Sequence, residues 1–480
     1  MVFSSSEFLL LFFPVVLILY NISKNIKYKN AILLISSLVF YAWGEPYFIF
    51  LMLFAIVINW VLGLLINKNE DKKRRKTFLA IGVIFDVSMM FVFKYLSFVC
   101  DNIDSLFGTT IDLSITLPIG ISFFTFQIMS YLFDVYYKKA DVQKNIFNLA
   151  LYITMFPQLI AGPIVRYQTV ADEINDRKCT SEDFTKGMIR FVYGLSKKII
   201  VSNYVAVIAD NIFALNPDEM SVASAWIGAI AYTLQIYFDF SGYSDMAIGM
   251  GLMFGFHFNE NFNYPYIASS VSDFWRRWHI SLSEWFRDYV YIPMGGNRVA
   301  KKKWILNLFT VWLLTGIWHG ANWTFVVWGL LYFCILLIEK LTGFTKKLKW
   351  FSHVYTILVV ILLWVIFRAD NLGYAFSYIL NMFGFGYCFA DNLFLFYLDG
   401  SKWVMIIGIL FSMPIIPFVK KKIIKLACRK CNSSETAEKK ELTLQKVFNA
   451  GSAVTVLFLF VICVILCVNS TYNPFIYFNF

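Results

Sequence analysis

His319 is the residue whose position first suggests catalysis. It lies in TGIWHGANW (315–323), at the end of the apolar run Trp304–Trp318. About 16 residues of helix rise roughly 24 Å against a bilayer core of about 30 Å, so we expect the imidazole deep in the membrane. A buried histidine can act there as a general base, and Gly316 and Gly320 are expected to leave space beside it. The alternative is a histidine that hydrogen-bonds across a helix bundle.

Tryptophans and arginines gather in a second stretch, SDFWRRWHISLSEWFRDYVYIPMGGNR (272–298). Helical spacing puts five apolar residues on one face, which predicts an amphipathic helix in the membrane interface: Phe274, Trp278, Leu282, Trp285 and Tyr289. Arginine pairs well with phosphate, and coenzyme A carries three phosphates. The stretch is therefore also a candidate donor site, meaning a binding site for a donor attached to coenzyme A. The residues assigned to that site are Trp275, Arg276, Arg277, Trp278, Arg287, Asn297 and Arg298. Membrane anchoring alone is the alternative.

Two further segments are unusual for a membrane protein. QIYFDFSGYSD (235–245) holds Asp239 and Asp245 between apolar runs, where it either lines a polar cavity or caps a broken helix. The aromatic end of the chain, NPFIYFNF (473–480), would promote aggregation if it were free. We expect it to be inserted into the protein or docked at the membrane interface.

The composition specifies what must position these residues. Of 480 residues, 59% are hydrophobic and 15% charged, against about 25% charged in soluble proteins. The mean hydropathy is +0.63, so a soluble enzyme, a secreted disulfide scaffold and a disordered chain are excluded. The net charge of +11 is spread over short basic clusters between apolar runs, which is typical of cytoplasmic loops beside anionic lipid and not of nucleic-acid binding.

Counting apolar runs against basic loops predicts an all-α polytopic membrane protein with roughly 11–12 transmembrane helices and both termini outside. Two runs break the alternation of sides and are expected to be re-entrant. The first is Ile146–Ile164, which Pro157, Gly162 and Pro163 would let bend. The second is Gly242–Phe258, which would follow a separate span at Val222–Phe238.

Five motifs resemble the membrane-bound O-acyltransferase (MBOAT) superfamily. DFWRRWHISLSEWFRDYVYIPMGGNR (273–298) and LTGIWHGANWTFVVWG (314–329) are similar to its bacterial branch of alginate and peptidoglycan O-acetyltransferases and teichoic-acid D-alanyl transfer proteins. PQLIAGPIVRY (157–167), YFDFSGYSDMAIGMGLMFGF (237–256) and the closing FIYFNF are also like that branch.

The resemblance implies one MBOAT domain over 1–480, a ring of helices in which funnels from both faces meet near a catalytic histidine. It implies re-entrant and donor-site segments in 145–300, catalytic helices in 304–340 and an extracellular tail at 469–480. His319 matches the catalytic histidine and His279 the second histidine of the family. The tail resembles that of a partner of teichoic-acid D-alanylation, so Tyr477 is expected to carry the acyl group or to plug the funnel.

The implied reaction is acetyl transfer from cytoplasmic acetyl-CoA, without a metal, for O-acetylation of an extracellular polysaccharide such as an alginate-like polymer or peptidoglycan. An extracellular SGNH-type enzyme would be the partner, and the protein would lie in the bacterial cell membrane. One alternative is D-alanyl transfer to teichoic acid from a carrier protein. Another is a transporter, although we find no paired repeats.

Overall fold

The protein is described by a computed structural model that covers residues 1–480 except 112, 161, 430–433, 470–471 and 477–480, and the side chains of 434–437. Within these residues every regular element is a helix. Seven helical stretches among them are long and apolar enough to cross a membrane. The chain is therefore an all-α, multi-pass membrane protein, as its composition predicts, whereas the larger number of spans stays a prediction.

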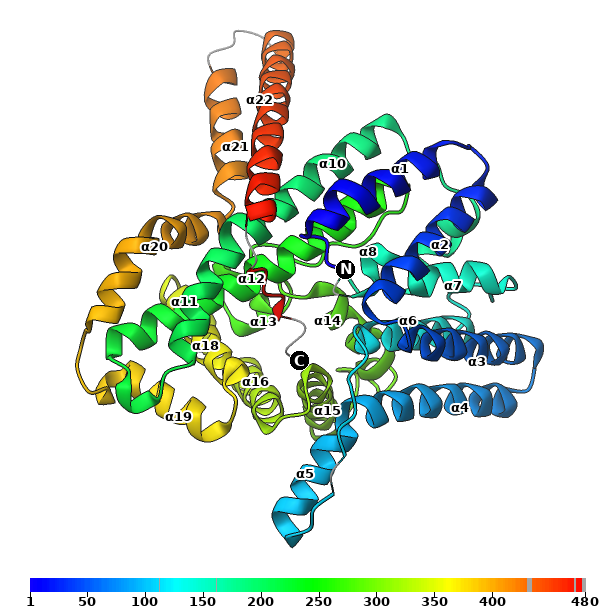
Figure 1. Cartoon of the computed structure of the whole chain (residues 1–480), viewed down its shortest axis with the longest axis horizontal. Coiled ribbons are helices and arrows are strands. Elements are labelled where there is room, and N and C mark those ends of the chain that lie inside the picture. Colours follow the sequence, from blue (N-terminus) through cyan, green and yellow to red (C-terminus); the bar gives the residue numbers. More distant parts are fainter. Residues whose placement is uncertain (112, 161, 430–433, 470–471, 477–480) are drawn as a thin grey trace.

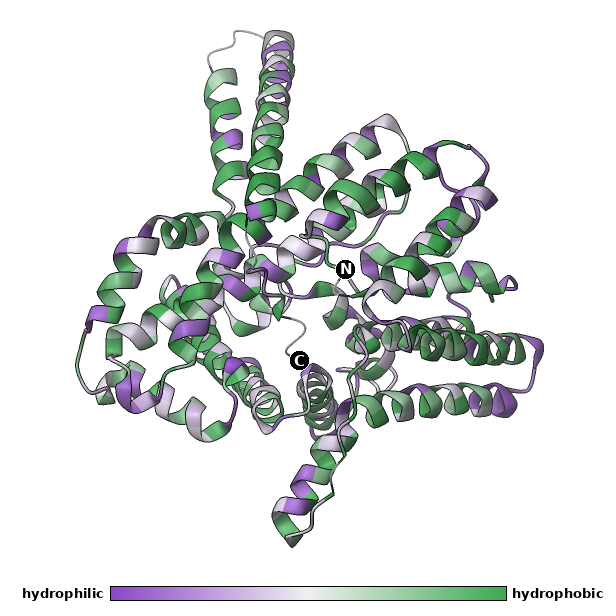
Figure 2. Cartoon of the chain, viewed as in Figure 1, coloured by the Kyte–Doolittle hydropathy of each residue, from purple (hydrophilic) through white to green (hydrophobic). Residues whose placement is uncertain are grey.

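The N-terminal third forms one side of a ring (Figure 1). Its elements are η1 (Phe8–Phe12), α1 (Phe13–Asn21), α2 (Ile26–Gly44), α3 (Phe48–Lys68), α4 (Lys72–Met90), η2 (Phe91–Tyr95), α5 (Leu96–Phe107), α6 (Ile121–Tyr136), α7 (Ile146–Thr154), α8 (Phe156–Leu159) and α9 (Tyr167–Asn175). Figure 2 shows hydrophobic residues along α3 and α4 and hydrophilic ones at the loop that joins them. That loop precedes the basic cluster KKRRK (72–76).

The run Ile146–Ile164 bends as predicted. Helix α7 ends at Thr154, Met155 is non-helical, and α8 begins at Phe156 with Pro157 in its first turn. The residues on both sides of the bend are buried. The interrupted backbone is therefore covered by protein, which is the condition for irregular backbone at membrane depth.

The middle of the chain supplies a long central helix and a run of short ones. The elements are α10 (Ser181–Ser196), η3 (Lys197–Ser202), α11 (Asn203–Phe213), η4 (Pro217–Glu219), α12 (Val222–Met253), η5 (Pro265–Ile267), α13 (Val271–Phe274), α14 (Ile280–Phe286) and η6 (Arg287–Tyr291). The expectation of two separate pieces around 239–245 is wrong, because α12 is one helix of 32 residues. It continues because Asp239 and Asp245 pair with Lys198 and Lys197 of η3, at 2.5 and 2.6 Å.

The expected single amphipathic helix over 272–298 is also wrong. The segment forms α13, α14 and η6, and it breaks at His279, whose φ is +45°. The loop before it pairs with the break, since Asn263 N donates to Arg277 O at 2.9 Å and Ile280 N donates to Asn261 O at 3.0 Å. The five residues of the expected apolar face are nevertheless all buried.

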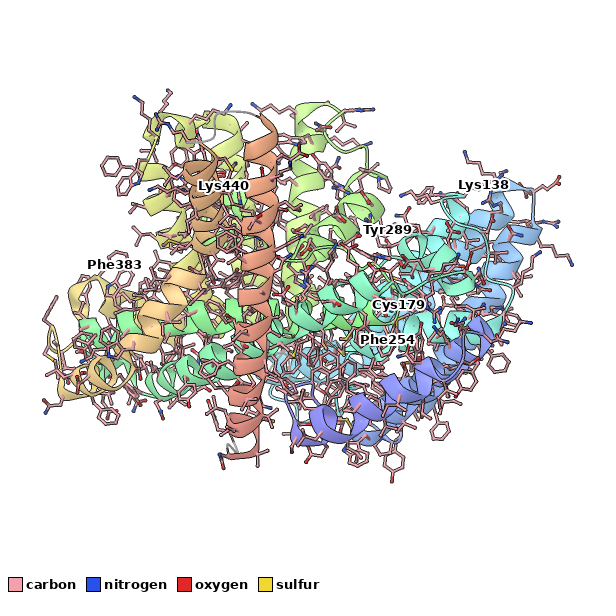
Figure 3. The ribbon with its side chains drawn as sticks, turned by 90° about the horizontal axis from the view of Figure 1, so that it is seen from above. Lys138, Cys179, Phe254, Tyr289, Phe383 and Lys440 are labelled. Atoms are coloured by element: carbon pink, nitrogen blue, oxygen red, sulfur yellow. The ribbon has the colours of Figure 1, made fainter. Side chains whose placement is uncertain are left out.

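The C-terminal part closes the ring and adds a projecting hairpin (Figure 1). Its elements are α15 (Lys301–His319), α16 (Trp323–Thr342), α17 (Phe344–Leu348), α18 (Phe351–Arg368), α19 (Leu372–Leu380), η7 (Asn381–Phe385), α20 (Asn392–Phe411), α21 (Ile415–Cys428) and α22 (Ser434–Asn469). In Figure 3, Lys138 and Lys440 lie toward the same edge of the molecule, and α22 runs from that edge to the opposite one. Two basic loops of the alternating pattern therefore share a side.

Helices α15 and α16 pack with their backbones in contact. A Cβ on Gly316 would lie 2.5 Å from Phe325 O, and one on Gly329 would lie 2.5 Å from Trp312 O. A Cβ on Gly320 would meet the Phe325 ring at 2.2 Å. The glycines thus serve close helix packing. The expectation that Gly316 and Gly320 leave space beside the imidazole is wrong, because Phe325 fills that space.

This contact makes a stability prediction. Gly316→Ala forces a methyl group against a backbone carbonyl, so we expect it to destabilise the fold by about 1–3 kcal/mol. Gly451→Ala is the control, because α22 has nothing within 4 Å of that position and alanine favours a helix by about 1 kcal/mol. Thermal unfolding in detergent, followed by tryptophan fluorescence, measures both. Equal midpoints for the two variants would contradict the packing.

Candidate active site

Helix α15 ends inside the protein, and side chains from η2 satisfy its last carbonyl oxygens. The buried Lys94 ammonium donates to Trp318 O at 2.6 Å and to His319 O at 3.1 Å. The Tyr95 hydroxyl donates to Ile317 O at 2.5 Å. A helix leaves its last four carbonyls without helical partners, and a positive charge is favourable at that end. Lys94 and Tyr95 therefore fix the backbone of His319.

Aromatic rings surround the His319 imidazole. Its ring centroid lies 4.9 Å from that of Trp318, 5.1 Å from Trp328 and 5.2 Å from Phe367. The residue is partly exposed, but its Nε2 is buried and has no hydrogen-bond partner among the residues that the structure describes. Buried polar atoms are normally paired, so this nitrogen is available to a substrate hydroxyl or a water molecule.

Two cavities approach this histidine from opposite ends of α16. The first, of about 490 Å³, is lined by Thr324 and Phe325 near the start of the helix. The second, of about 250 Å³, is lined by Leu336 and Lys340 near its end. Sixteen residues separate Thr324 from Lys340, so these two wall residues lie about 24 Å apart along the helix.

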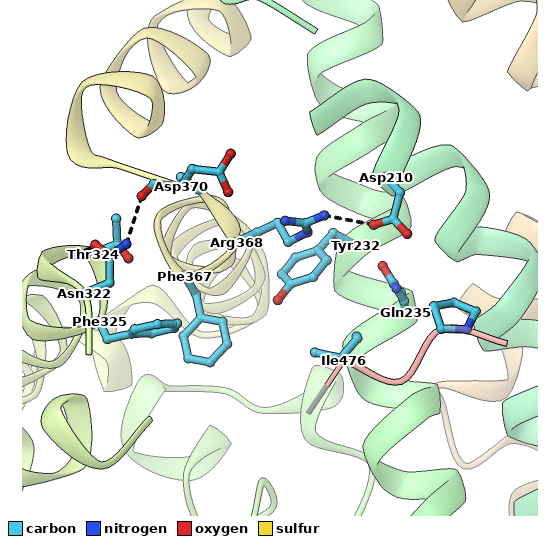
Figure 4. Close-up of a pocket in the computed structure, with 12 residues that line it drawn as sticks. Asp210, Tyr232, Gln235, Asn322, Thr324, Phe325, Phe367, Arg368, Asp370 and Ile476 are labelled. Atoms are coloured by element: carbon cyan, nitrogen blue, oxygen red, sulfur yellow. Dashed lines mark hydrogen bonds and ion pairs between the residues drawn. The ribbon is translucent and has the colours of Figure 1, made fainter. Parts of the chain in front are cut away.

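The first, which we call the tail-side cavity, also contains the end of the described chain. Pro474 and Ile476 form part of its wall, beside Tyr232 and Gln235 of α12. Figure 4 shows the Arg368 guanidinium pointing to Asp210 at the rim, where the two are 2.9 Å apart. The expectation that the tail is inserted into the protein is confirmed for the described residues, and Tyr477 lies outside them.

The second, which we call the basic-side cavity, contains three of the residues assigned to a donor site. Trp275, Arg276 and Arg287 line it, with Lys340 and with Thr315, which lies one helical turn before His319. The Trp275 ring meets Trp312 and Tyr332 edge-on at 4.8 and 5.0 Å. Its Nε1 is buried without a partner in the described part of the chain.

The arginines of this segment differ in their partners. Arg277 donates to Asp273 at 3.1 Å and to the Asn263 carbonyl, and so closes the loop. Arg287 pairs with Asp288 at 2.8 Å. Arg276 is exposed and has no ion pair within the described ranges. Of the two arginines that line the basic-side cavity, Arg276 is therefore the one more available to a phosphate.

Asp288 pairs with Arg287, which lines the basic-side cavity. It also pairs with Arg166, which in turn reaches Glu284 at 3.0 Å. Burial works to raise the pKa of the Asp288 carboxyl, but the hydrogen bond and charge of Arg287 and the charge of Arg166 lower it more. The resulting pKa lies below the usual value, so this carboxylate is ionised at neutral pH.

Four other residues that the sequence assigned to the site are not in the wall of either cavity: Trp278, Asn297, Arg298 and His279. Trp278 is buried against Trp364 with ring centroids 5.0 Å apart, away from the cavity wall. Asn297 and Arg298 are exposed in the loop before α15 and do not line either cavity. His279 is buried, with both ring nitrogens unpartnered among the described residues, and its ring lies 6.0 Å from Trp318. Trp318 thus touches both His279 and His319.

The side chains that could donate a hydrogen bond to a reacting oxygen differ in whether they are already paired. The Asn322 side chain caps α16 through Thr324 N at 3.0 Å and donates to Asp370 O at 2.9 Å. The Trp323 indole donates to Asn102 at 2.9 Å. The Nε1 atoms of Trp318 and Trp328, whose rings both lie beside His319, are buried without a partner in the described segments.

Comparison with known proteins identifies the family of the chain. The model of the MBOAT, membrane-bound O-acyltransferase family matches residues 135–380, which include His279, His319 and most of both cavity walls. A probable alginate O-acetylase, AlgI, of Pseudomonas aeruginosa is 46% identical over 399 residues, covering 80% of this chain and 75% of that protein. A peptidoglycan O-acetyltransferase of Helicobacter pylori is 32% identical over 522 residues, covering 100% of this chain and 98% of the other.

A teichoic acid D-alanyltransferase of Bacillus subtilis is 30% identical over 266 residues, but covers only 51% of this chain and 65% of its own length. The similarity is thus more extensive toward the O-acetyltransferases. Because the family and these relatives are acyltransferases, the alternative interpretation as a transporter is not supported. The chain belongs to the membrane-bound O-acyltransferase family.

Proposed function

We propose that the protein takes an acetyl group from acetyl-CoA in the basic-side cavity and passes it, at His319, toward the tail-side cavity. The group then serves O-acetylation of an extracellular polysaccharide, such as an alginate-like polymer or peptidoglycan. The basic-side cavity faces the cytoplasm in this proposal, and both termini face outward in a bacterial cell membrane. An extracellular SGNH-type enzyme receives the group, as the family resemblance implies.

One observation carries the proposal. His319, whose Nε2 has no partner among the described residues, contacts Phe367 in the wall of the tail-side cavity. It also contacts Trp328, whose ring lies 5.7 Å from Trp275 in the wall of the basic-side cavity. A single general base is thus one or two rings from both cavities. Transfer across the membrane requires a donor and an acceptor to meet at one such point.

The chemistry follows from the groups that surround this point. His319 Nε2 takes the proton of an acceptor hydroxyl, whose oxygen attacks the thioester carbonyl. The carbon–sulfur bond breaks, the thiolate leaves with the histidine's proton, and an ester forms. In this proposal the Trp318 Nε1–H, which is buried without a partner among the described residues, stabilises the oxyanion, as preorganised donors do most effectively in a dry site. His279, whose ring lies 6.0 Å from that of Trp318, helps to orient the indole in this proposal.

Tyr477 is the first acceptor in this proposal. It follows Ile476, which lines the tail-side cavity, and its hydroxyl would hold the acetyl group as an ester before the extracellular partner takes it. The alternative is that the tail only plugs the cavity and a polysaccharide hydroxyl is acetylated directly.

The test uses purified protein in detergent with radiolabelled acetyl-CoA. We expect label on the wild type and none on His319→Ala or Tyr477→Phe, with CoA release falling by at least about 10²-fold in His319→Ala, as for loss of a general base. Label that survives Tyr477→Phe but not His319→Ala would remove the relay and keep the transferase. Turnover of a D-alanyl carrier protein without CoA release would instead favour teichoic-acid D-alanylation.

Two adjacent arginines test the donor site. Arg276→Ala removes from the cavity wall a positive charge that has no ion pair among the described residues, so we expect the KM for acetyl-CoA to rise about tenfold, equivalent to about 1.4 kcal/mol. Arg277→Ala removes a loop contact instead, and should lower the melting temperature while the KM stays near the wild-type value. Steady-state CoA release and thermal unfolding measure the two effects. The reverse pattern would move the donor site away from this cavity.

A further inference from the structure

The described part of the tail is held by side chains from distant parts of the fold. The Tyr472 hydroxyl donates to Asp210 at 2.5 Å. The Asn473 amide donates to the Ser4 carbonyl and hydroxyl at 3.1 and 2.9 Å and accepts from Asn203 at 3.3 Å. These contacts bring the tail to the centre of the ring.

The next three residues meet a buried ion pair through their backbone. Lys198 and Asp239 lie 2.5 Å apart, with side chains 3% and 0% exposed. The Lys198 ammonium also donates to Pro474 O. The Ile476 amide donates to Asp239 Oδ2 at 3.0 Å. Each member of the pair therefore binds one backbone group of the tail, two residues apart.

The side chains of Phe475 and Ile476 pack in different places. Phe475 lies against Tyr243, with ring centroids 5.0 Å apart, in the core built by the N-terminal helices. Ile476 packs in the second core, built around α12, α16 and α18, and also lines the tail-side cavity. The segment thus joins the two cores, and each residue has its own site.

The pair is poorly explained as a structural ion pair alone. Removing two charges from water costs several kcal/mol each, and a buried pair repays this only when its other donors and acceptors are also satisfied. Here the tail backbone supplies that satisfaction on both sides. The backbone contacts hold the segment, and the separate packing sites of Phe475 and Ile476 determine which residue stands at each contact.

We propose that Lys198 and Asp239 form a register clamp, a binding site for the backbone of a C-terminal peptide, which fixes residues 474–476 against the tail-side cavity. The proposal deepens, and its functional part rests on, the proposed role of Tyr477. The Cα atoms of consecutive residues are 3.8 Å apart, so the clamp limits how far Tyr477 can be from that cavity. One added residue after the clamp would shift Tyr477 along the chain by one such step.

The docking itself is tested without any acyl donor. In Lys198→Met/Asp239→Leu both charges are replaced by apolar groups, so neither is left buried and unpaired. The control is Lys197→Met/Asp245→Leu, which removes the neighbouring 2.6 Å pair. Purified full-length protein is treated with carboxypeptidase Y, and intact mass gives the last residue retained. We expect wild type and control to retain Ile476 and the clamp variant to lose it and continue toward Tyr472. The same end point in all three would overturn the clamp.

The register is tested by two insertions of one glycine, which leave both charges in place. An insertion after Asn469 lies before every tail contact described above, so the clamp should restore the register and acetyl labelling should stay within about twofold of wild type. An insertion after Ile476 should reduce labelling at least about tenfold, because it shifts the acceptor Tyr477 away from the clamp by one Cα–Cα step. Equal labelling of the two variants would overturn the register role. If the wild type itself takes no label, the proposed function fails, and the digestion end points still decide the clamp.

Discussion

A helix that ends within a membrane protein leaves its last carbonyl oxygens without partners unless the protein supplies them. Helix α15 ends in this way at His319, and Lys94 and Tyr95 supply three donors to the carbonyls of residues 317–319. The remaining ammonium contact, to Ser122 at 3.2 Å, ties the same point to α6. The position of the imidazole between two cavities depends on this arrangement.

The same physical solution recurs where the tail docks. In both places a buried lysine binds backbone carbonyls, at the end of α15 through Lys94 and at Pro474 through Lys198. Among the described residues Lys94 has only neutral oxygen partners, whereas Lys198 has Asp239 beside it. A charge kept in the interior is costly and usually functional. These two lysines hold the two segments, the catalytic helix and the tail, that the proposed transfer brings together.

The sequence predicted the elements whose signal is local. Apolarity identified the helical membrane class, and the motif around His319 and the tryptophan–arginine segment identified two regions that the fold brings to one place. Errors arose where partners lie far along the chain. Asp239 and Asp245 were expected to interrupt a helix because Lys197 and Lys198 could not be assigned to them. Lys94 was missed because its contacts to Trp318 and His319 are 224 and 225 residues away, although a lysine inside the apolar run 78–98 was a usable signal.

The central claim is that the side chains of η2 hold His319 where donor and acceptor meet. The most direct test is the kcat of CoA release by Lys94→Met, which removes the ammonium from both carbonyls, compared with Lys94→Arg, which keeps a positive charge. We predict that Lys94→Met lowers kcat at least about tenfold while the KM for acetyl-CoA changes little, since Lys94 does not line the basic-side cavity, and that Lys94→Arg retains more activity. A folded Lys94→Met variant with wild-type kcat would contradict the account.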